Sequence, residues 1–469
     1  MGCLSSHTME RKLSLTKSDF VHKKHGSVRT SYEILDTLGD GGFGVVTRIR
    51  ERKSGLVRAM KEVQKSKISD DQYHLILNEI EILIRLDHPN IMKIYEVLES
   101  PKSYQIVCEY LSGGELLDVL LRQKRFTEEK TAKYIYDILS GVYYCHNMNI
   151  VHNDLKLENL MLDSKDPDAR VKIIDFGISQ YLDKSGLTGQ LGSVYYLAPE
   201  ILTGNYNEKV DLWSIGVIMY YMLTGNLPFR CNTNEDLLEK SKTGKFDTTS
   251  RTWIVLSSEC KDLISKFLNP NPKNRISAAE AMQHIWFDKA LQLSSDSINT
   301  NFYTSIKKFQ KLNPIATAIL VYISTQMLTS QEETPIVSLF KSIDTDGNGK
   351  LSKQEIFDAC KKFPLLTSEE IDEIFNTCDM DHSGFIDYSE FLAVSMTWNH
   401  ILKREKIKMI FDFFDMGRDG KLTIPELRTN LIQFTDSQWV DFLKIIDTNK
   451  DGVISLEEFR NYLCRLVDE

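Results

Sequence analysis

Two polar runs near the middle of the chain carry the kinds of side chain that phosphoryl transfer needs. His152-Asn153-Asp154-Leu155-Lys156-Leu157-Glu158-Asn159 comes first, and Asp175-Phe176-Gly177 follows it. Such transfer asks little covalent chemistry of a protein, which must orient a hydroxyl, hold Mg2+ and spread positive charge over the phosphate. Two carboxylates, an amide and a lysine can do all of this. We therefore expect Mg2+-assisted phosphoryl transfer at these runs.

Each side chain of this set has its own expected role. Asp154 accepts or orients the proton of the acceptor hydroxyl, and Lys156 steadies the phosphate that is transferred. Asn159 and Asp175 are the expected Mg2+ ligands.

A glycine-rich run upstream, Gly39-Asp40-Gly41-Gly42-Phe43-Gly44-Val45-Val46, fits G-x-G-x-x-G-x-V. Missing side chains let backbone amides approach phosphate oxygens closely. A dinucleotide-binding loop would lead directly into a helix, whereas residues 45–50 continue as a strand toward Arg58-Ala59-Met60-Lys61. This order favours a cover over ATP, with Lys61 on the α- and β-phosphates.

Lys61 needs an anionic partner, and the helix predicted over 71–86 offers two. Glu79 is the preferred partner because of the register set by Leu86-Asp87-His88-Pro89-Asn90-Ile91, and Glu81 is the alternative. Either glutamate is otherwise a solvated helical charge. Downstream, Ala198-Pro199-Glu200, residues 211–216 and Arg275 complete the set, and Glu200 with Arg275 is expected to form a buried ion pair.

A second chemistry repeats in the last third of the chain. Acidic loops begin at Asp344, Asp379, Asp415 and Asp447. Oxygens at loop positions 1, 3, 5, 7 and 9, a bidentate carboxylate at 12 and glycine at 6 are typical of EF-hand Ca2+ loops. Three loops are complete, with these expected ligands: Asp344, Asp346, Asn348, Lys350 through its carbonyl, Ser352 and Glu355; Asp379, Asp381, Ser383, Phe385 through its carbonyl, Asp387 and Glu390; Asp447, Asn449, Asp451, Val453 through its carbonyl, Ser455 and Glu458.

The third loop departs from this pattern. Gly417 stands where position three needs a ligand, and Arg418 adds positive charge beside it. The remaining expected ligands are Asp415, Asp419, Lys421 through its carbonyl, Thr423 and Glu426. Water can replace the missing ligand at reduced affinity. Whether this loop binds Ca2+ is left open.

Charge and cysteine usage narrow the class of protein. Residues 336–469 contain 25 acidic and 16 basic side chains and so account for the whole net charge of −9. The eight cysteines form no C-x-x-C pair, and no signal peptide precedes them, which favours a reducing, intracellular compartment. The longest apolar runs fall short of the roughly 20 residues of a membrane span. We expect no transmembrane helix.

The N-terminus suggests lipid attachment. Gly2 and Ser6 fit the N-myristoylation pattern, and Cys3 is a candidate for palmitoylation. One myristoyl chain binds membranes only marginally, so a second signal is needed. Cys3 supplies it, or the basic side chains do: Arg11, Lys12, Lys17, Lys23 and Lys24. The alternative is an unmodified tail.

Four regions follow from these patterns: a tail over 1–31, a domain over 32–287, a junction over 288–335 and a Ca2+-binding domain over 336–469. The junction has apolar residues at helical spacing within about 302–328, among the basic residues Lys307, Lys308 and Lys311. It predicts an amphipathic helix, which Asn313-Pro314 interrupts or restarts. Such a helix suits an acidic Ca2+ sensor, and a merely packing helix is the alternative.

Residues 32–287 resemble the eukaryotic protein kinases, and the whole chain resembles the calcium-dependent protein kinases of plants and protists. The resemblance implies an α+β protein, with a bilobal kinase fold followed by an all-α EF-hand domain. Lys156 is typical of serine/threonine kinases in that superfamily. The ATP-binding residues implied are Leu38, Gly39, Gly41, Gly44, Val46, Ala59, Lys61, Glu109, Leu111 and Glu115. Cys108 is the corresponding small gatekeeper, and Glu115 with Glu158 implies substrates with upstream Arg or Lys.

One departure bears on regulation. Asn153 stands where these kinases usually have an arginine that pairs with a phosphate on the activation loop. Control is therefore expected from Ca2+, with the junction repressing the kinase at rest. ATP, Mg2+ and Ca2+, protein substrates and the cytosolic face of membranes are the expected partners of a monomer that binds no nucleic acid. A catalytically dead Ca2+-dependent scaffold and a calcium buffer are the alternatives.

Overall fold

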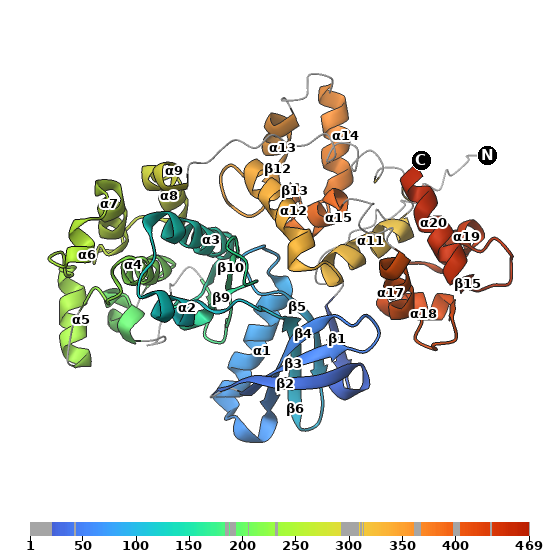
Figure 1. Cartoon of the computed structure of the whole chain (residues 1–469), viewed down its shortest axis with the longest axis horizontal. Coiled ribbons are helices and arrows are strands. Elements are labelled where there is room, and N and C mark those ends of the chain that lie inside the picture. Colours follow the sequence, from blue (N-terminus) through green and yellow to red (C-terminus); the bar gives the residue numbers. More distant parts are fainter. Residues whose placement is uncertain are drawn as a thin grey trace, which may run out of the picture. The chain divides into compact units, whose positions relative to one another are not determined.

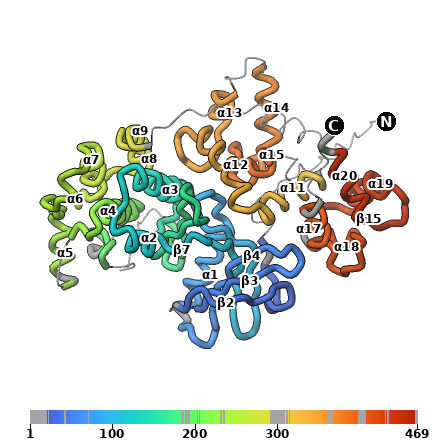
Figure 2. The backbone as a smooth tube through the Cα atoms, in the orientation of Figure 1, coloured from blue at the N-terminus to red at the C-terminus, as the bar shows by residue number. Residues whose placement is uncertain are grey.

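The computed structural model describes residues 21–41, 44–182, 187, 194–204, 206–229, 233–291, 309, 312, 314–360, 367–396, 404–431 and 434–468. These residues divide into two compact units, which are described separately below (Figures 1 and 2). The large unit contains residues 21–297 and 329–351, and the small unit contains the described residues of 298–328 and 352–469.

A six-stranded sheet forms one lobe of the large unit, in the order β1-β5-β6-β4-β3-β2 (Figure 1). Its strands are β1 (His22–His25), β2 (Tyr32–Gly41), β3 (Gly44–Glu51), β4 (Val57–Gln64), β5 (Ile94–Glu99) and β6 (Ser103–Glu109). The glycine-rich run is the hairpin between β2 and β3, and its register ends at the pair Gly41 and Gly44. The loop thus connects two strands, as the sequence predicts.

Helix α1 (Asp70–Arg85) completes this lobe. It begins at a capping box, in which the Ser69 hydroxyl and the Gln72 side chain each accept from the other's backbone N–H. Ile76, Ile80 and Leu83 are buried at helical spacing, so one face of the helix lies in the core. This packing fixes the rotation of α1 and hence the direction of its polar side chains.

The second lobe of the large unit is mainly helical. Its helices are α2 (Leu116–Gln123), α3 (Glu128–Asn147), α4 (Lys209–Thr224), α5 (Asn234–Thr243), α6 (Arg251–Ile254), α7 (Ser258–Phe267), α8 (Ala278–Met282) and α9 (Ile285–Leu291). This lobe also has five short strands: β7 (Gly114–Glu115), β8 (Ile150–Val151), β9 (Leu160–Leu162), β10 (Val171–Ile173) and β11 (Gln180–Tyr181). The first polar run lies between β8 and β9, and the second lies between β10 and β11. Helix α4 is buried on nearly all sides, and a Cβ at Gly216 would lie 2.6 Å from Phe267, so α4 and α7 approach closely there.

The expected tail over 1–31 is too long. Strand β1 pairs in parallel with β5, Lys24 pairs with Glu96 at 3.4 Å, and Val28 is buried with its N–H on Gln105. Residues 21–31 therefore belong to the sheet lobe. The edge of β5 offers unpaired backbone groups, and β1 satisfies them.

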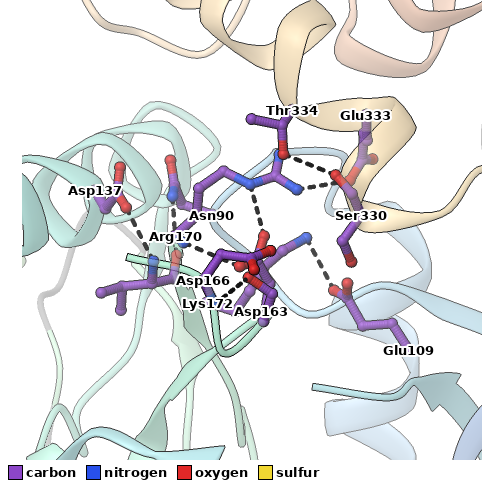
Figure 3. A network of polar contacts seen from close by, with 12 residues as sticks. Asn90, Glu109, Asp137, Asp163, Asp166, Arg170, Lys172, Ser330, Glu333 and Thr334 are labelled. Atoms are coloured by element: carbon purple, nitrogen blue, oxygen red, sulfur yellow. Dashed lines mark hydrogen bonds and ion pairs between the residues drawn. The ribbon is translucent and has the colours of Figure 1, made fainter. Parts of the chain in front are cut away.

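The large unit also contains helix α12 (Ser330–Ile343) and the first part of the first acidic loop. Figure 3 shows Glu333 of this helix beside Arg170, at 3.0 Å, while Arg170 also bonds Asp163 at 2.7 Å. Lys341 pairs with Asp137 of α3 at 2.5 Å. Pro335 was expected at a domain boundary but lies inside α12. This helix begins at a capping box on Thr329, and its Phe340 is buried.

The small unit is helical. Its helices are α11 (Pro314–Gln326), α13 (Lys353–Cys360), α14 (Ser368–Cys378), α15 (Tyr388–Ser395), α17 (Arg404–Phe414), α18 (Ile424–Asn430), α19 (Asp436–Ile446) and α20 (Leu456–Asp468). Its short strands are β13 (Phe385–Ile386), β14 (Lys421–Leu422) and β15 (Ile454–Ser455), while β12 (Leu351–Ser352) begins it. Strands β14 and β15 pair antiparallel, with Leu422 opposite Ile454, so a short sheet joins the third and fourth loops.

The junction helix differs from its prediction. Its described part, α11, begins at Pro314 and is apolar on every side. It packs against α15 and α19, and Tyr322 contacts the rings of Phe413 and Phe414. The described part of α11 has no amphipathic face, because apolar and small side chains occupy nearly all of its positions and most of them are buried. The basic residues Lys307, Lys308 and Lys311, and Ile306, lie outside the described residues.

Candidate catalytic centre and calcium loops

The hairpin between β2 and β3 requires glycine for two reasons. Gly44 has a φ of +146°, and a Cβ there would lie 2.2 Å from the Glu62 carbonyl oxygen of β4. Gly39 has open space around its Cα, which leaves room for a phosphate. Val46 lies opposite Lys61 in the register of β3 and β4. Residues 42 and 43 lie outside the described part.

Lys61 forms an ion pair with Glu79. Its Nζ lies 2.8 and 2.9 Å from the two carboxylate oxygens, and Glu79 is buried. Glu81 points elsewhere and pairs with Arg85 on the surface. Burial would lower the pKa of Lys61, but the charges of Glu79 and Asp175 outweigh it and raise the pKa above its ordinary value. Lys61 is therefore a fixed positive charge at neutral pH.

The loop after β8 gathers three of the expected catalytic side chains. Lys156 Nζ donates to Asp154 Oδ2 at 2.5 Å, and Asn159 Nδ2 donates to the same oxygen at 3.1 Å. Asn159 also donates to the Asp154 carbonyl at 2.9 Å. These bonds fix the Asp154 carboxylate within its own loop.

Asp175 follows β10 in a left-handed conformation, with a φ of +64°, and the Gly177 N–H donates to its Oδ1 at 3.2 Å. Its charge acts on Lys61 from the other lobe of the same unit. The Asn159 side-chain nitrogen donates to Asp154, so the Asn159 side-chain oxygen is the atom that remains for a cation. Oxygen donors of this kind fit Mg2+.

A buried carboxylate holds the backbone of the loop that contains Asp154. Asp211 of α4 accepts the N–H groups of His152 and Asn153 at 2.9 and 3.0 Å, and His146 Nε2 lies 2.9 Å from it. Burial would raise the pKa of Asp211, but the hydrogen bond and charge of His146 hold it below its ordinary value. Asp211 therefore stays ionised and holds the backbone that carries Asp154.

The resemblance to protein kinases implies that the adenine of ATP binds at the end of β6 and the residues after it. Ala59 is opposite Cys108 in the sheet, and Cys108 is buried with its Sγ 3.6 Å from the Ala59 carbonyl. Burial raises the pKa of Cys108 to about 12, so this side chain is small and neutral. The Glu109 carboxylate pairs with Lys172 at 3.1 Å and accepts the Lys93 N–H at 2.6 Å, so it is already engaged within the protein. Leu111 is buried and Leu38 is exposed.

Two further charged sets were expected. Arg275 is fully buried and holds Glu200 through two hydrogen bonds of 2.5 and 2.9 Å, which confirms the predicted ion pair. Burial and the charges of Asp118 and Glu158 raise the pKa of Glu115. Glu115 and Glu158 thus lie in one acidic neighbourhood.

The second calcium loop is fully described. Oxygens of Asp379, Asp381 and Glu390 lie within 4.8 Å of one another, and the Gly384 N–H donates to Asp379 at 3.1 Å. Ser383 and the Phe385 carbonyl, two other expected ligands, bond each other at 3.0 Å. Burial raises the pKa of Glu390 to about 9. The carboxylates of this loop converge as a cation site requires.

The fourth loop has the same scaffold. The Gly452 N–H donates to Asp447 at 2.9 Å, and Glu458 accepts from Asn449 and Ser455. Asn449 and Asp451 bond within the loop, next to Val453. Burial would raise the pKa of Glu458, but the hydrogen bonds from Ser455 and its neighbours lower it to about 2. This carboxylate is ready for a cation at neutral pH.

The third loop keeps the scaffold without its third ligand. Glu426 accepts from the Gly417 N–H at 2.8 Å and from Thr423, and the Gly420 N–H donates to Asp415 at 2.9 Å. A Cβ at Gly417 would lie 3.4 Å from the Glu426 carboxylate, so a side chain there would point at the acidic cluster. The Lys421 N–H donates to Asp419.

The first loop is shared between the units, and each part is described separately. In the large unit, the Gly349 N–H donates to Asp344 at 2.9 Å, and Asn348 bonds Asp346 and the Lys350 N–H. In the small unit, Ser352 donates to Glu355 through its N–H and hydroxyl.

Sequence reasoning missed two contacts that shape the catalytic centre. Asn78 of α1 donates to the Ser179 carbonyl at 2.8 Å, and Arg170 joins the second lobe to α12. Asn78 could have been noticed as the residue beside Glu79. No local signal marks the contact of Arg170 with α12, because Glu333 is 163 residues away.

Comparisons with known proteins agree with this geometry. Residues 32–287 match the protein kinase domain family, and residues 333–396 and 404–464 match the EF-hand domain pair. Calcium-dependent protein kinase 4 of Plasmodium berghei is 35% identical over 95% of this chain and 89% of its own length. Calcium-dependent protein kinase 9 of Arabidopsis thaliana is 32% identical over 97% of this chain and 84% of its own.

Proposed function

The chain belongs to the calcium-dependent protein kinase family, and from this premise we propose that it is a serine/threonine kinase that Ca2+ releases from repression by residues 291–335. Its kinase domain transfers the γ-phosphate of ATP to protein hydroxyls. Ca2+ binding to the EF-hands is the principal activating signal in this proposal.

The proposed transfer divides among residues already placed. Lys61, held by Glu79, binds the α- and β-phosphates, and Lys156 neutralises charge on the phosphate that moves. Asp154, fixed by Lys156 and Asn159, orients the acceptor hydroxyl and takes its proton. Mg2+, held by Asn159 and Asp175, would offset the charge of the β- and γ-phosphates.

One observation carries the proposed link between sensor and kinase. Helix α12, the first helix of the first EF-hand, is tied to the kinase lobe by the ion pair of Glu333 with Arg170 (Figure 3). A second ion pair, of Lys341 with Asp137, adds to it. The loop that follows packs there too, since a Cβ at Gly349 would lie 2.6 Å from His88. A change in this loop on Ca2+ binding would act directly on the kinase lobe.

The state of α11 supports capture of the junction by the sensor. This apolar helix lies among EF-hand helices, which are the surfaces that an opened Ca2+ sensor offers to a helix. When those helices hold α11, the junction is withheld from the kinase. Differential affinity of the EF-hands for α11 with and without Ca2+ would shift the equilibrium.

Substrate preference and location belong to the same proposal. Glu115 and Glu158 form an acidic neighbourhood that suits basic residues near the acceptor hydroxyl. Gly2 and Cys3, the proposed acylation sites, lie outside the described residues. Within the described part, no helix has both the length and the apolar character of a membrane span. We propose a monomer at the cytosolic face of membranes.

The test is phosphorylation of a basic peptide by the full-length chain, with free Ca2+ and with chelator. We expect strong stimulation by Ca2+, and we expect a chain ending at Leu291 to keep some activity without Ca2+ dependence. Full activity of the intact chain in chelator would disprove the proposed repression. Calcium binding without any phosphorylation would favour a scaffold.

A further inference from the structure

The residues that follow Asp175-Phe176-Gly177 are held by uncharged side chains. Asn153 Nδ2 donates to the Ile178 carbonyl at 3.3 Å, and Asn78 Nδ2 donates to the Ser179 carbonyl at 2.8 Å. Ser179 in turn donates from its hydroxyl to the His152 carbonyl at 3.1 Å. Strand β11 then pairs with β8. Residues 178–181 are thereby bound to both the catalytic loop and α1.

Asn153 is well suited to this contact. It has a φ of +68°, a left-handed conformation that asparagine tolerates better than most residues. Its side chain is buried, and its backbone N–H is fixed by Asp211 at 3.0 Å. A buried arginine at this position would need an anion beside it, whereas a neutral amide carries no charge to compensate. The Asn153 amide nitrogen has the Ile178 carbonyl as its acceptor, and its oxygen is buried without a hydrogen-bond partner among the described residues.

Asn78 joins this contact to the nucleotide-binding lysine. It directly precedes Glu79, so the same turn of α1 bonds both Ser179 and Lys61. A shift of residues 178–181 would therefore strain the ion pair of Lys61 as well as the backbone of Asp175. The hydrogen bond from Asn78 to Ser179, at 2.8 Å, joins the two lobes of the kinase domain here.

We propose that Asn78 and Asn153 are positioning residues that hold residues 178–181, and with them Asp175, in the arrangement ready for nucleotide without a phosphate on the activation segment. The inference rests on the proposed kinase function. It adds that Ca2+ releases a kinase domain whose metal-binding centre is already assembled in the unphosphorylated chain.

The test uses the full-length chain at saturating Ca2+, after phosphatase treatment verified by intact mass. Asn153→Gly keeps the left-handed backbone, and Asn78→Ala improves helix propensity, so both variants should fold. We expect each to lower kcat roughly fivefold and to raise the Mg2+ concentration for half-maximal activity by a similar factor, as expected for one lost hydrogen bond. The KM for peptide should not change.

Matched variants separate positioning from general damage. Lys124→Gly also introduces glycine at a positive φ, +67°, at an exposed residue that follows α2, and His74→Ala alters an exposed residue one turn before Asn78. Neither should change kcat or the Mg2+ requirement. Asn153→Asp retains shape but cannot donate, so it should lose activity as Asn153→Gly does.

Three results would overturn the inference. One is a dephosphorylated wild type that loses its Ca2+-stimulated activity. Another is an unchanged Mg2+ requirement in both Asn153→Gly and Asn78→Ala, in a wild type that is otherwise a Ca2+-stimulated kinase. The third is a wild type without any phosphorylation activity. That result would disprove the proposed kinase function as well, whereas the first two results would leave it standing.

Discussion

Asp154 lies in a loop that supplies its own supports. Lys156 and Asn159 hold this carboxylate, whereas Lys61, the proposed nucleotide-binding residue, pairs with Glu79. In the proposed mechanism the acceptor hydroxyl and the nucleotide therefore depend on different residues. Asp154→Ala should therefore reduce phosphoryl transfer at least about a hundredfold, the lower range for a lost general base. ATP affinity should remain near that of wild type. Peptide phosphorylation and nucleotide titration check the two statements, and near-normal turnover would contradict the role.

Asp211 gives a pH-dependent prediction. Its folded pKa is below its ordinary value, chiefly because His146 offsets the effect of burial. Its contribution to the free energy of unfolding is thus fully present above the unfolded pKa of about 3.9 and is lost as pH falls through the folded value.

Asp211→Asn should cost about 1 to 3 kcal/mol at neutral pH, since buried N–H groups lose a charged acceptor. The difference from wild type should stay constant from about pH 8 to pH 5 and shrink below that. Urea unfolding followed by tryptophan fluorescence at several pH values measures it. A difference that widens on acidification would show the sign to be wrong.

At the scale of elements, α12 is the helix on which the proposed regulation depends most. The ion pair of Glu333 with Arg170 is nearly buried, and breaking one side of such a pair costs roughly 3 kcal/mol. In the structure this contact is present at the same time as the ion pair of Lys61 with Glu79, which the proposed phosphoryl transfer uses. Glu333→Ala should therefore raise the Ca2+ needed for half-maximal activity and lower the maximum. Gln331→Ala, an exposed change on the same helix, serves as control and should change neither.

The calcium loops should not be equivalent. Glu390 belongs to a cluster of three converging carboxylates, whereas Glu426 faces Gly417, which offers no ligand. Glu390→Gln should shift the Ca2+ activation curve roughly tenfold or more, and Glu426→Gln less than about twofold, because differential affinity sets the shift. Glu355→Gln should behave as Glu390→Gln does. Equal shifts from all three would show that the third loop contributes fully.

For the whole molecule, the proposed membrane attachment depends on acylation of the first residues of the chain. Without glycine at position 2 no myristoyl chain can be attached, so Gly2→Ala should move the protein to the soluble fraction. Cys3→Ser should weaken attachment less completely, because one acyl chain remains. Cell fractionation measures both, and an intact mass without an acyl group on the co-expressed wild type would exclude the anchor.

Much of the site could be inferred from sequence because its residues are close together along the chain. Asp154, Lys156 and Asn159 share one loop, and each EF-hand takes its ligands from twelve consecutive positions. Residue type and spacing then nearly determine the local geometry. The glycine-rich hairpin was predictable for the same reason, since short-range sterics decide where glycine is required.

Tertiary structure decided what depends on segments far apart. The sequence favoured Glu79 over Glu81, and the rotation of α1, which the core sets, confirmed that preference. The contact of Asn153 with Ile178, the ion pair of Arg170 with Glu333 and the burial of α11 on every side join surfaces that no local pattern relates. Sequence specifies which groups can pair within a few residues. Which distant groups do pair is settled only when the whole chain packs, because each burial depends on all the others.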